Sequence, residues 1–302
     1  MSRRYQEKQN ARVNDEERWS DAPDMQSVLD LEPLDRDLFR GHNAISARNR
    51  RSLYGGQVAA QALRAAGLTV DPDRHAHSLH GYFLRPGRAD RPVILHVDRD
   101  RDGRSFSARH VRAVQEGEVI FSMLASFHVD EPSATYDSVP TKTPTPPLDD
   151  VEARGDFIIE MHEITPMKIE GERILYPDSM WIRLKDPLVD TDRLARACAL
   201  TYMSDMGSGF GQLRVDGLPS GGASIDHAVW FHRDISVDGW LLLELHPSKA
   251  GGSRGVYTGG VRDRDGVLGL MCAQELLLRP HPPEHVAAMR AMIEGRDGDG
   301  SG

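Results

Sequence analysis

The chain has 302 residues, of which 39% are hydrophobic and 27% are charged, and its formal net charge is −9. This apolar content is ordinary for a globular protein and excludes disorder over most of the length, while the length favours two domains or two fused copies of one. An acidic chain without an apolar run of about 20 residues predicts neither nucleic-acid binding nor a membrane span.

The N-terminal segment, residues 1–24, is charged, has no apolar periodicity and is too polar for a signal peptide. We therefore expect a mobile arm there and a cytoplasmic protein. The two cysteines, Cys198 and Cys272, cannot form a disulfide framework or a four-thiolate zinc site.

Residues 25–130 are expected to form the first folded unit, because polar and apolar side chains alternate there with the period of two that predicts β-strands. The clearest runs begin at His77, Pro92, Ser105 and Val119. The pair Glu116-Gly117 suits a hairpin turn between the last two runs. After Gly55 and Gly56, the sequence QVAAQALRAA predicts a helix with a wide face of small apolar residues, which we expect a sheet to wrap.

A proline-rich linker is predicted over residues 131–150, since its prolines forbid regular ladders and helices. Residues 151–285 form the second expected unit, in which strand-like runs begin at Phe157, Ser179, Ser224, Trp240, Gly255 and Leu268. Its helix, RLARACALTYMSD, can be capped by Asp192 or Thr191. Residues 286–302 are expected to be a helix end followed by a flexible tail from Glu294.

The two halves resemble each other. Phe83-Leu84-Arg85 matches Phe231-His232-Arg233 at an offset of 148 (231 − 83), and the turn glycine Gly117 matches Gly266 at an offset of 149 (266 − 117). The strands that follow these turns align without gaps. We interpret this as an internal duplication; chance similarity between amphipathic strands is the alternative.

Four motifs stand out along the chain: LYGGQVAAQAL, HSLHGYFLRPG, RDGRSFSARHVRAVQEGEVIFSMLASF and SIDHAVWFHR. Together they resemble the signatures of the type II acyl-CoA thioesterases of bacteria and peroxisomes. The resemblance covers roughly residues 30–280. It implies an α+β double hotdog, in which two antiparallel sheets each wrap round a central helix.

In that family an Asp, a Thr or Ser and a Gln hold the water that attacks the thioester. The resemblance implies these roles for Asp205 in YMSD, Ser224 in SIDH and Gln274 in CAQE. The family often has Thr at the middle position; Ser224 keeps the hydroxyl but lacks the methyl group that helps to orient it. Without the resemblance, the same three residues read as a solvated helix-end carboxylate and two ordinary polar strand residues.

The chemistry agrees with these residue types. A thioester carbonyl is poorly resonance-stabilised, so a positioned water, a general base and oxyanion stabilisation suffice without a covalent nucleophile. Asp205 is the expected base, while Ser224 and Gln274 orient the water. Backbone N–H groups at a helix N-terminus are a usual source of oxyanion donors, so Gly55 and Gly56 are the candidates.

The duplication predicts one hydrolytic site in each chain. Ser224 corresponds to Ala76 (224 − 148) and Gln274 to Ala125 (274 − 149), and neither alanine can orient a water. Residues 53–66, which include the first helix, contain no Asp or Glu that could act as a base.

Other patterns in the sequence suggest rival sites. Gly251-Gly252-Ser253-Arg254-Gly255 matches the nucleophile elbow G-x-S-x-G, but that elbow joins a strand to a helix and here a strand follows, so Ser253 is not expected to be catalytic. Strand histidines could suggest a metal, yet their spacing is irregular and we expect structural roles for His77, His80, His227 and His232.

The CoA phosphates require a local basic patch, for which the first half offers Arg85, Arg88, Arg91, Arg101, Arg104 and Arg109; a solvated mixed-charge surface explains any one of these arginines equally well.

The sequence therefore predicts an acyl-CoA thioesterase of fatty acid and lipid metabolism that releases free fatty acid and CoA, with no metal and no cofactor. Two alternatives are an enoyl-CoA hydratase of the same fold, whose Asp and His motif we do not find, and an acyl-CoA-binding protein that has lost catalysis. The expected partners are the acyl-CoA substrate and further copies of the chain, because hotdog units tend to bury sheet edges against one another. Neither nucleic acid nor membrane insertion is expected.

Overall fold

The computed structural model describes residues 24–43, 52–137, 145–147, 154–155, 158–189 and 192–298. The expected mobile arm lies outside these ranges except for its last residue, Asp24, whose side chain accepts a hydrogen bond from Ser27 N–H and caps helix α2 (Met25–Leu29). Much of the expected linker also lies outside them, and residues 131–137 and 145–147 have no regular structure.

One antiparallel sheet of 14 strands runs through the molecule. Its first-half strands are β1 (Glu32–Asp35), β2 (Leu38–Gly41), β3 (Arg74–Phe83), β4 (Val93–Asp102), β5 (Phe106–Gln115) and β6 (Glu118–Val129). Its second-half strands are β7 (Arg154–Gly155), β8 (Ile159–Glu163), β11 (Ser179–Leu184), β12 (Gly222–Ser224), β13 (Asp226–Phe231), β14 (Leu241–Gly251), β15 (Arg254–Arg262) and β16 (Leu268–Leu278). The order is β1-β2-β4-β5-β6-β3-β13-β16-β15-β14-β11-β8-β7, with β12 pairing to β16, and a separate hairpin joins β9 (Lys168–Glu170) to β10 (Arg173–Leu175).

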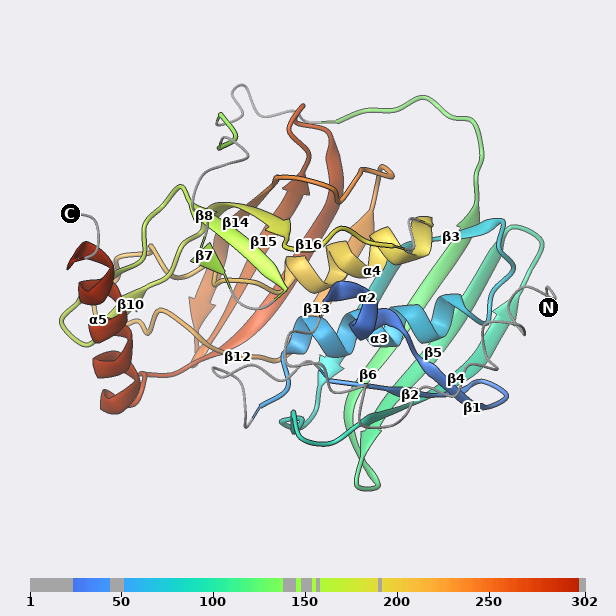
Figure 1. Ribbon diagram of the computed structural model, residues 1–302, viewed down its shortest axis with the longest axis horizontal. Helices are drawn as coiled ribbons and strands as arrows, with labels where there is room; N and C mark the ends of the chain where they lie inside the picture. The colour runs from blue at the N-terminus through green and yellow to red at the C-terminus, as the bar shows by residue number, and fades with distance from the viewer. Residues whose placement is uncertain are drawn as a thin grey trace.

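The two halves join where β3 pairs with β13, so that the sheet continues from one half into the other (Figure 1). The two central helices, α3 (Gly55–Gly67) and α4 (Arg193–Ser204), lie side by side against this sheet. Each half therefore supplies antiparallel strands and one central helix, as expected, but the two expected sheets are joined edge to edge into one by the β3–β13 pairing.

The strand registers confirm the internal duplication. His80 lies opposite Leu124 in the β3–β6 ladder, and Ala228 lies opposite Ala273 in the β13–β16 ladder. The offsets between these pairs, 228 − 80 and 273 − 124, are the same two offsets that relate the matching segments of the sequence.

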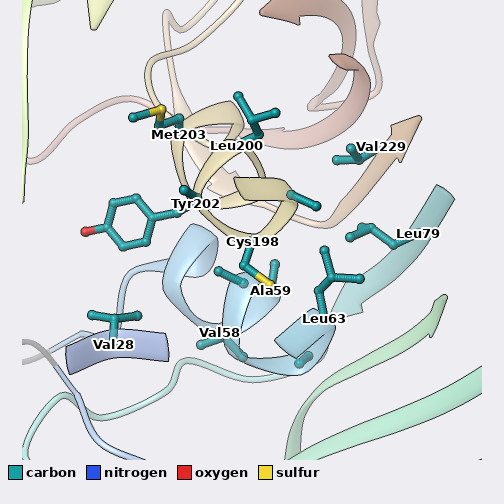
Figure 2. Packing of buried hydrophobic residues seen from close by; sticks show 14 of the residues in the cluster. Val28, Val58, Ala59, Leu63, Leu79, Cys198, Leu200, Tyr202, Met203 and Val229 are labelled. Carbon is teal, nitrogen blue, oxygen red and sulfur yellow. The ribbon is translucent and has the colours of Figure 1, made fainter. Parts of the chain in front are cut away.

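Small side chains allow the central helices to pack closely. Ala59 and Ala62 of α3 are fully buried, and Figure 2 shows Val58 and Ala59 of α3 next to Cys198 of α4. At the end of α3, a Cβ on Gly67 would lie only 2.4 Å from Leu194 Cδ1. The alanine-rich helix is therefore buried between the sheet and the second helix, as its composition predicted.

The predicted helix ends and turns are also found. Asp192 caps α4, because its carboxylate accepts a hydrogen bond from Ala195 N–H at 2.6 Å. Glu116 and Gly117 both have positive φ, 51° and 83°, as a two-residue hairpin turn requires. The last helix, α5 (Pro283–Gly298), continues past Glu294, where the tail was expected to begin. None of the helices described here has the length and hydropathy needed to cross a membrane.

Candidate active site

Asp205 lies at the C-cap of α4, where backbone carbonyl dipoles make a helix end unfavourable for a carboxylate. The side chain is directed toward the start of α3 in the other half, where the backbone N–H of Gly56 favours the ionised carboxyl group and limits the rise of its pKa. A Cβ on Gly55 would lie 2.7 Å from Asp205 Oδ2. The glycine at position 55 therefore lets the carboxylate approach the helix N-terminus, whose dipole stabilises negative charge.

Ser224 and Gln274 meet Asp205 at this helix end. Gln274 Nε2 donates to Asp205 Oδ1 at 2.9 Å and to Ser224 Oγ at 2.5 Å, while Ser224 Oγ donates to the same carboxyl oxygen at 3.4 Å. Gln274 is buried in β16, and the other two side chains keep partial exposure, which leaves them accessible to water. The structure thus brings the three predicted residues into one hydrogen-bonded cluster.

The environment of this cluster changes how its carboxyl group titrates. Burial raises the pKa of Asp205 above the usual carboxyl value, and the nearby His227 together with the hydrogen bonds from its neighbours limits the rise. A carboxylate whose pKa lies closer to the working pH is a stronger base for a proton of water.

His227, for which the sequence predicted only a structural role, lies beside the cluster. It is fully buried, and its Nε2 lies 2.8 Å from Ser204 Oγ. The Ser204 hydroxyl also hydrogen-bonds to the Thr201 carbonyl, so the buried ring is joined to the end of α4. Burial lowers the pKa of His227, which keeps the ring neutral. The sequence carried a signal for this inward position of His227. Side chains alternate along a strand, so Asp226 and His227 in SIDH must face opposite sides of the sheet.

Two tyrosines hold the halves together at this place. Tyr54 OH donates to the Tyr202 carbonyl at 2.8 Å, and the two rings meet edge to face with centroids 4.8 Å apart. The start of α3 is therefore fixed to the end of α4. Gly55 and Gly56, the predicted oxyanion donors, lie at this junction next to Asp205, and their role stays a prediction.

The corresponding place in the first half lacks this chemistry. Ala76 lies opposite Phe127 in the first half, just as Ser224 lies opposite Leu276 in the second, so the register supports the predicted correspondence. The helix α3 is followed by Leu68 at its C-cap, where α4 has a carboxylate.

Ser253 is not in a nucleophile elbow. Gly251 pairs with Arg254 across the β14–β15 hairpin, and the two residues between them, Gly252 and Ser253, have φ of 59° and 62°. These values describe a two-residue hairpin turn, which does not lead into a helix. The G-x-S-x-G pattern at this place therefore reflects the residues of a tight hairpin turn and not a nucleophile.

The predicted basic patch is largely neutralised. Four of its arginines form ion pairs: Arg85 with Glu118, Arg88 with Asp90, Arg91 with Glu116 and Arg109 with Asp102. Arg109 is 1% exposed and cannot contact a CoA phosphate, so its inclusion in the patch was wrong. Arg101 and Arg104 are exposed and, among the described residues, form no ion pair.

The strand histidines have protein partners. His77 Nε2 lies 2.8 Å from Ser126 Oγ, and His80 Nε2 lies 3.1 Å from an Asp226 carboxylate oxygen. Burial lowers the pKa of His232. Within the described ranges, no three or more His, Cys, Asp or Glu side chains are grouped as a metal site would require.

Comparisons with known proteins point to one family. An acyl-CoA thioesterase N-terminal domain model matches residues 46–128, and an acyl-CoA thioesterase C-terminal domain model matches residues 146–278. Acyl-coenzyme A thioesterase 8 of Rattus norvegicus is 38% identical over 289 residues, which cover 85% of this chain and 89% of that protein.

Solved structures agree with this result. The acyl-CoA thioesterase II TesB2 of Mycobacterium marinum aligns with a TM-score of 0.69 and 36% identity, over 85% of this chain and 97% of that one. A protein of Alicyclobacillus acidocaldarius described as having a hot dog fold aligns with a TM-score of 0.64 at 18% identity, over 85% of this chain and 98% of that one, and supports the fold alone. The predicted α+β double hotdog is thus confirmed.

Proposed function

This chain belongs to the acyl-CoA thioesterase family and is an acyl-CoA thioesterase, and we propose that it hydrolyses the thioester by direct attack of a water held by Asp205, Ser224 and Gln274. The observation that carries the proposal is the hydrogen-bonded cluster that these three side chains form at the junction of the two central helices. The products are a free fatty acid and CoA.

In this mechanism the Asp205 carboxylate accepts a proton from the water while the water oxygen bonds to the thioester carbonyl carbon. Ser224 and Gln274 fix the direction of the water's lone pair by hydrogen bonding. The tetrahedral intermediate then collapses, the C–S bond breaks, and the departing CoA sulfur takes up the proton. The water supplies the hydroxyl group of the fatty acid, so no covalent enzyme intermediate forms.

The raised pKa of Asp205 supports its role as base, because the partly buried carboxylate binds a proton more readily than one in water. The Gly56 N–H from the first half limits the rise of this pKa and so favours the ionised carboxylate that accepts the proton. The first half also supplies part of the wall of the site. We propose one hydrolytic site per chain, because Ala76 and Ala125 replace the water-orienting residues of the second half.

A thiol-release assay with acyl-CoA esters of increasing chain length tests the proposal. In Asp205→Asn the amide keeps the size of the side chain but cannot accept the proton, so we expect kcat to fall by roughly a hundredfold or more while acyl-CoA still binds. The matched control is Asp192→Asn at the other end of α4, where Asn caps a helix as well as Asp does and activity should remain. Near-normal turnover by Asp205→Asn would contradict the mechanism.

The same thiol-release assay on the wild type separates hydrolysis from the rival functions. A binding protein without catalysis would release no thiol in the wild type, and an enoyl-CoA hydratase would consume an enoyl-CoA without releasing CoA.

We also propose that the chain is cytoplasmic and assembles with copies of itself through the sheet ends at β1 and β7; light scattering during gel filtration measures the assembly.

A further inference from the structure

Tyr257 is a buried polar residue that the mechanism above does not use. Its side chain is fully buried in β15, and its hydroxyl has no hydrogen-bond partner among the described residues. Buried hydroxyl groups are nearly always hydrogen-bonded, because an unpaired one keeps the full cost of leaving water. An unpaired hydroxyl beside a reaction centre therefore points to a partner that arrives with the substrate.

The strand register places Tyr257 next to the proposed water site. Tyr257 lies directly opposite Gln274 in the β15–β16 ladder, so the two side chains project from the same face of the sheet, with Cβ atoms about 5 Å apart. A Cβ on Gly209 would lie 2.4 Å from Tyr257 Cβ and 2.6 Å from its Cγ, so the loop that follows Asp205 clamps the ring. The hydroxyl is thereby held in one position, as a preorganised donor must be.

The surroundings keep this hydroxyl protonated. Burial raises the pKa of Tyr257 well above its ordinary value, and the groups Cys272, Asp205 and Asp226 raise it further. At neutral pH the phenol is a hydrogen-bond donor and does not exchange its proton with the reacting groups.

The equivalent residue of the first half shows how a buried side chain at this place is normally satisfied. Arg109 lies opposite Ala125 as Tyr257 lies opposite Gln274, and the offsets between these pairs, 257 − 109 and 274 − 125, are those of the duplication. The guanidinium of Arg109 bonds to Thr69 Oγ1, to Asp102 Oδ1 and to three backbone carbonyls. In the first copy the protein itself pairs the donors, and in the second copy it does not.

We propose that the Tyr257 hydroxyl donates a hydrogen bond to the thioester carbonyl oxygen of acyl-CoA. As the water oxygen bonds to the carbonyl carbon, the π electrons of the C=O bond move to this oxygen, and the phenol stabilises the charge without transferring its proton. When the C–S bond breaks, the carbonyl re-forms. The inference rests on the proposed direct attack of water, and it assigns an oxyanion donor in the second half in addition to the candidates Gly55 and Gly56 at the start of α3.

Tyr257→Phe tests this role, because it removes only the hydroxyl and keeps the ring against Gly209. We expect kcat to fall by roughly a hundredfold, as for other oxyanion donors, with KM changed by less than about threefold. The affinity for an S-alkyl-CoA thioether, which has no carbonyl oxygen, should be unchanged. The melting temperature without ligand should be equal or higher, since an unpaired buried hydroxyl is lost.

Tyr176→Phe is the matched control. Its hydroxyl is paired with His285 Nε2 at 3.3 Å, in contact with the last helix, and its removal should leave kcat unchanged. A kcat of Tyr257→Phe within threefold of the wild type would overturn the inference. So would a loss of thioether affinity equal to the loss of kcat, because the hydroxyl would then support the pocket and not the oxyanion. Asp205→Asn assayed in parallel separates the two hypotheses: if it stays active, the water mechanism itself is wrong.

Discussion

The central helices of the two halves end in chemically opposite ways. α3 is followed by Leu68 and Thr69, and the hydroxyl and carbonyl of Thr69 accept hydrogen bonds from the buried Arg109. α4 is followed by Asp205, whose carboxyl instead meets Ser224 and Gln274. The first copy pairs a fully buried arginine with its own polar groups, whereas the second gathers its polar groups around a carboxyl that keeps partial exposure. A duplicated fold can therefore place stability in one copy and chemistry in the other.

The two copies nevertheless depend on each other. The start of α3 lies against the Asp205 carboxyl and stabilises its charge, and Tyr54 joins that start to the end of α4 through the Tyr202 carbonyl. Neither half alone contains both parts of the site. We therefore expect the halves to be inseparable for activity even though only one carries the base.

The largest expected effect concerns the number of sites. Titration with a non-hydrolysable S-alkyl-CoA thioether should saturate near one ligand per chain, measured by calorimetry. Asp205→Asn should show no residual second activity, because the first copy has alanines where Ser224 and Gln274 stand in the second. Two equivalent, competent sites per chain would break the contrast between the halves and the roles given to these residues.

Arg109→Met tests whether the first copy serves stability. The substitution keeps an unbranched side chain but removes the donors to the Thr69 carbonyl and to Asp102, which retains its hydrogen bond from Ser107 Oγ, so the free energy of unfolding should fall by about 2 kcal/mol. The kcat of the folded protein should stay within about twofold of the wild type. Urea denaturation measures the first quantity. The control is Arg99→Met: the Arg99 side chain is 39% exposed against 1% for Arg109, so its pair with Asp37 should contribute less than about 1 kcal/mol. Equal losses would show that burial of the arginine is not the cause.

Gly55→Ala tests the contribution of the first half to the site. Its Cβ would lie 2.7 Å from Asp205 Oδ2 and must displace the carboxylate, so kcat should fall by roughly tenfold or more. In Gly103→Ala the new Cβ would meet chiefly the mobile end of the Arg101 side chain, and activity should be unchanged. Full activity in Gly55→Ala would mean that Asp205 does not need its place at the start of α3.

A smaller effect is expected in the pH dependence of stability. Because the folded protein raises the pKa of Asp205, the native state binds the proton more tightly than the unfolded state does. This contribution is fully present below the unfolded value of about 3.8 and is lost as the pH rises through the folded pKa. Denaturation from pH 4 to pH 8 should therefore show the stability of Asp205→Asn increasing relative to the wild type. A relative decrease would mean that the folded pKa is lowered.

The smallest expected effect is that of Ser253→Ala. Ser253 lies in the β14–β15 turn, so the variant should keep most of its activity. Rapid mixing of the wild type with acyl-CoA should show no burst of thiol, because water attack forms no acyl-enzyme. Mass spectrometry that finds an acyl group on Ser253 would favour a serine mechanism and remove Asp205 as the base.

The sequence alone determined the duplicated architecture and the capped helix α4. Strand periodicity and turn chemistry act over a few residues, so they can be read without knowing how the chain folds. The roles of Asp205, Ser224 and Gln274 came from the resemblance, and the structure then brought the three side chains together. The two offsets of the duplication were visible in the sequence and reappear in the strand ladders.

Only the tertiary structure decided what surrounds those residues. The alternation of side chains along β5 placed Arg109 on the same inward face as Val111, but arginines are rarely buried. Arg109 is buried because Thr69 and Asp102 lie within hydrogen-bonding reach of its guanidinium group. The partner of the Gly56 N–H was likewise hidden, because Asp205 lies far along the chain, in the other half. Contacts of this kind are set by strand register and by how closely two helices approach, and these are properties of the packed molecule that no local pattern records.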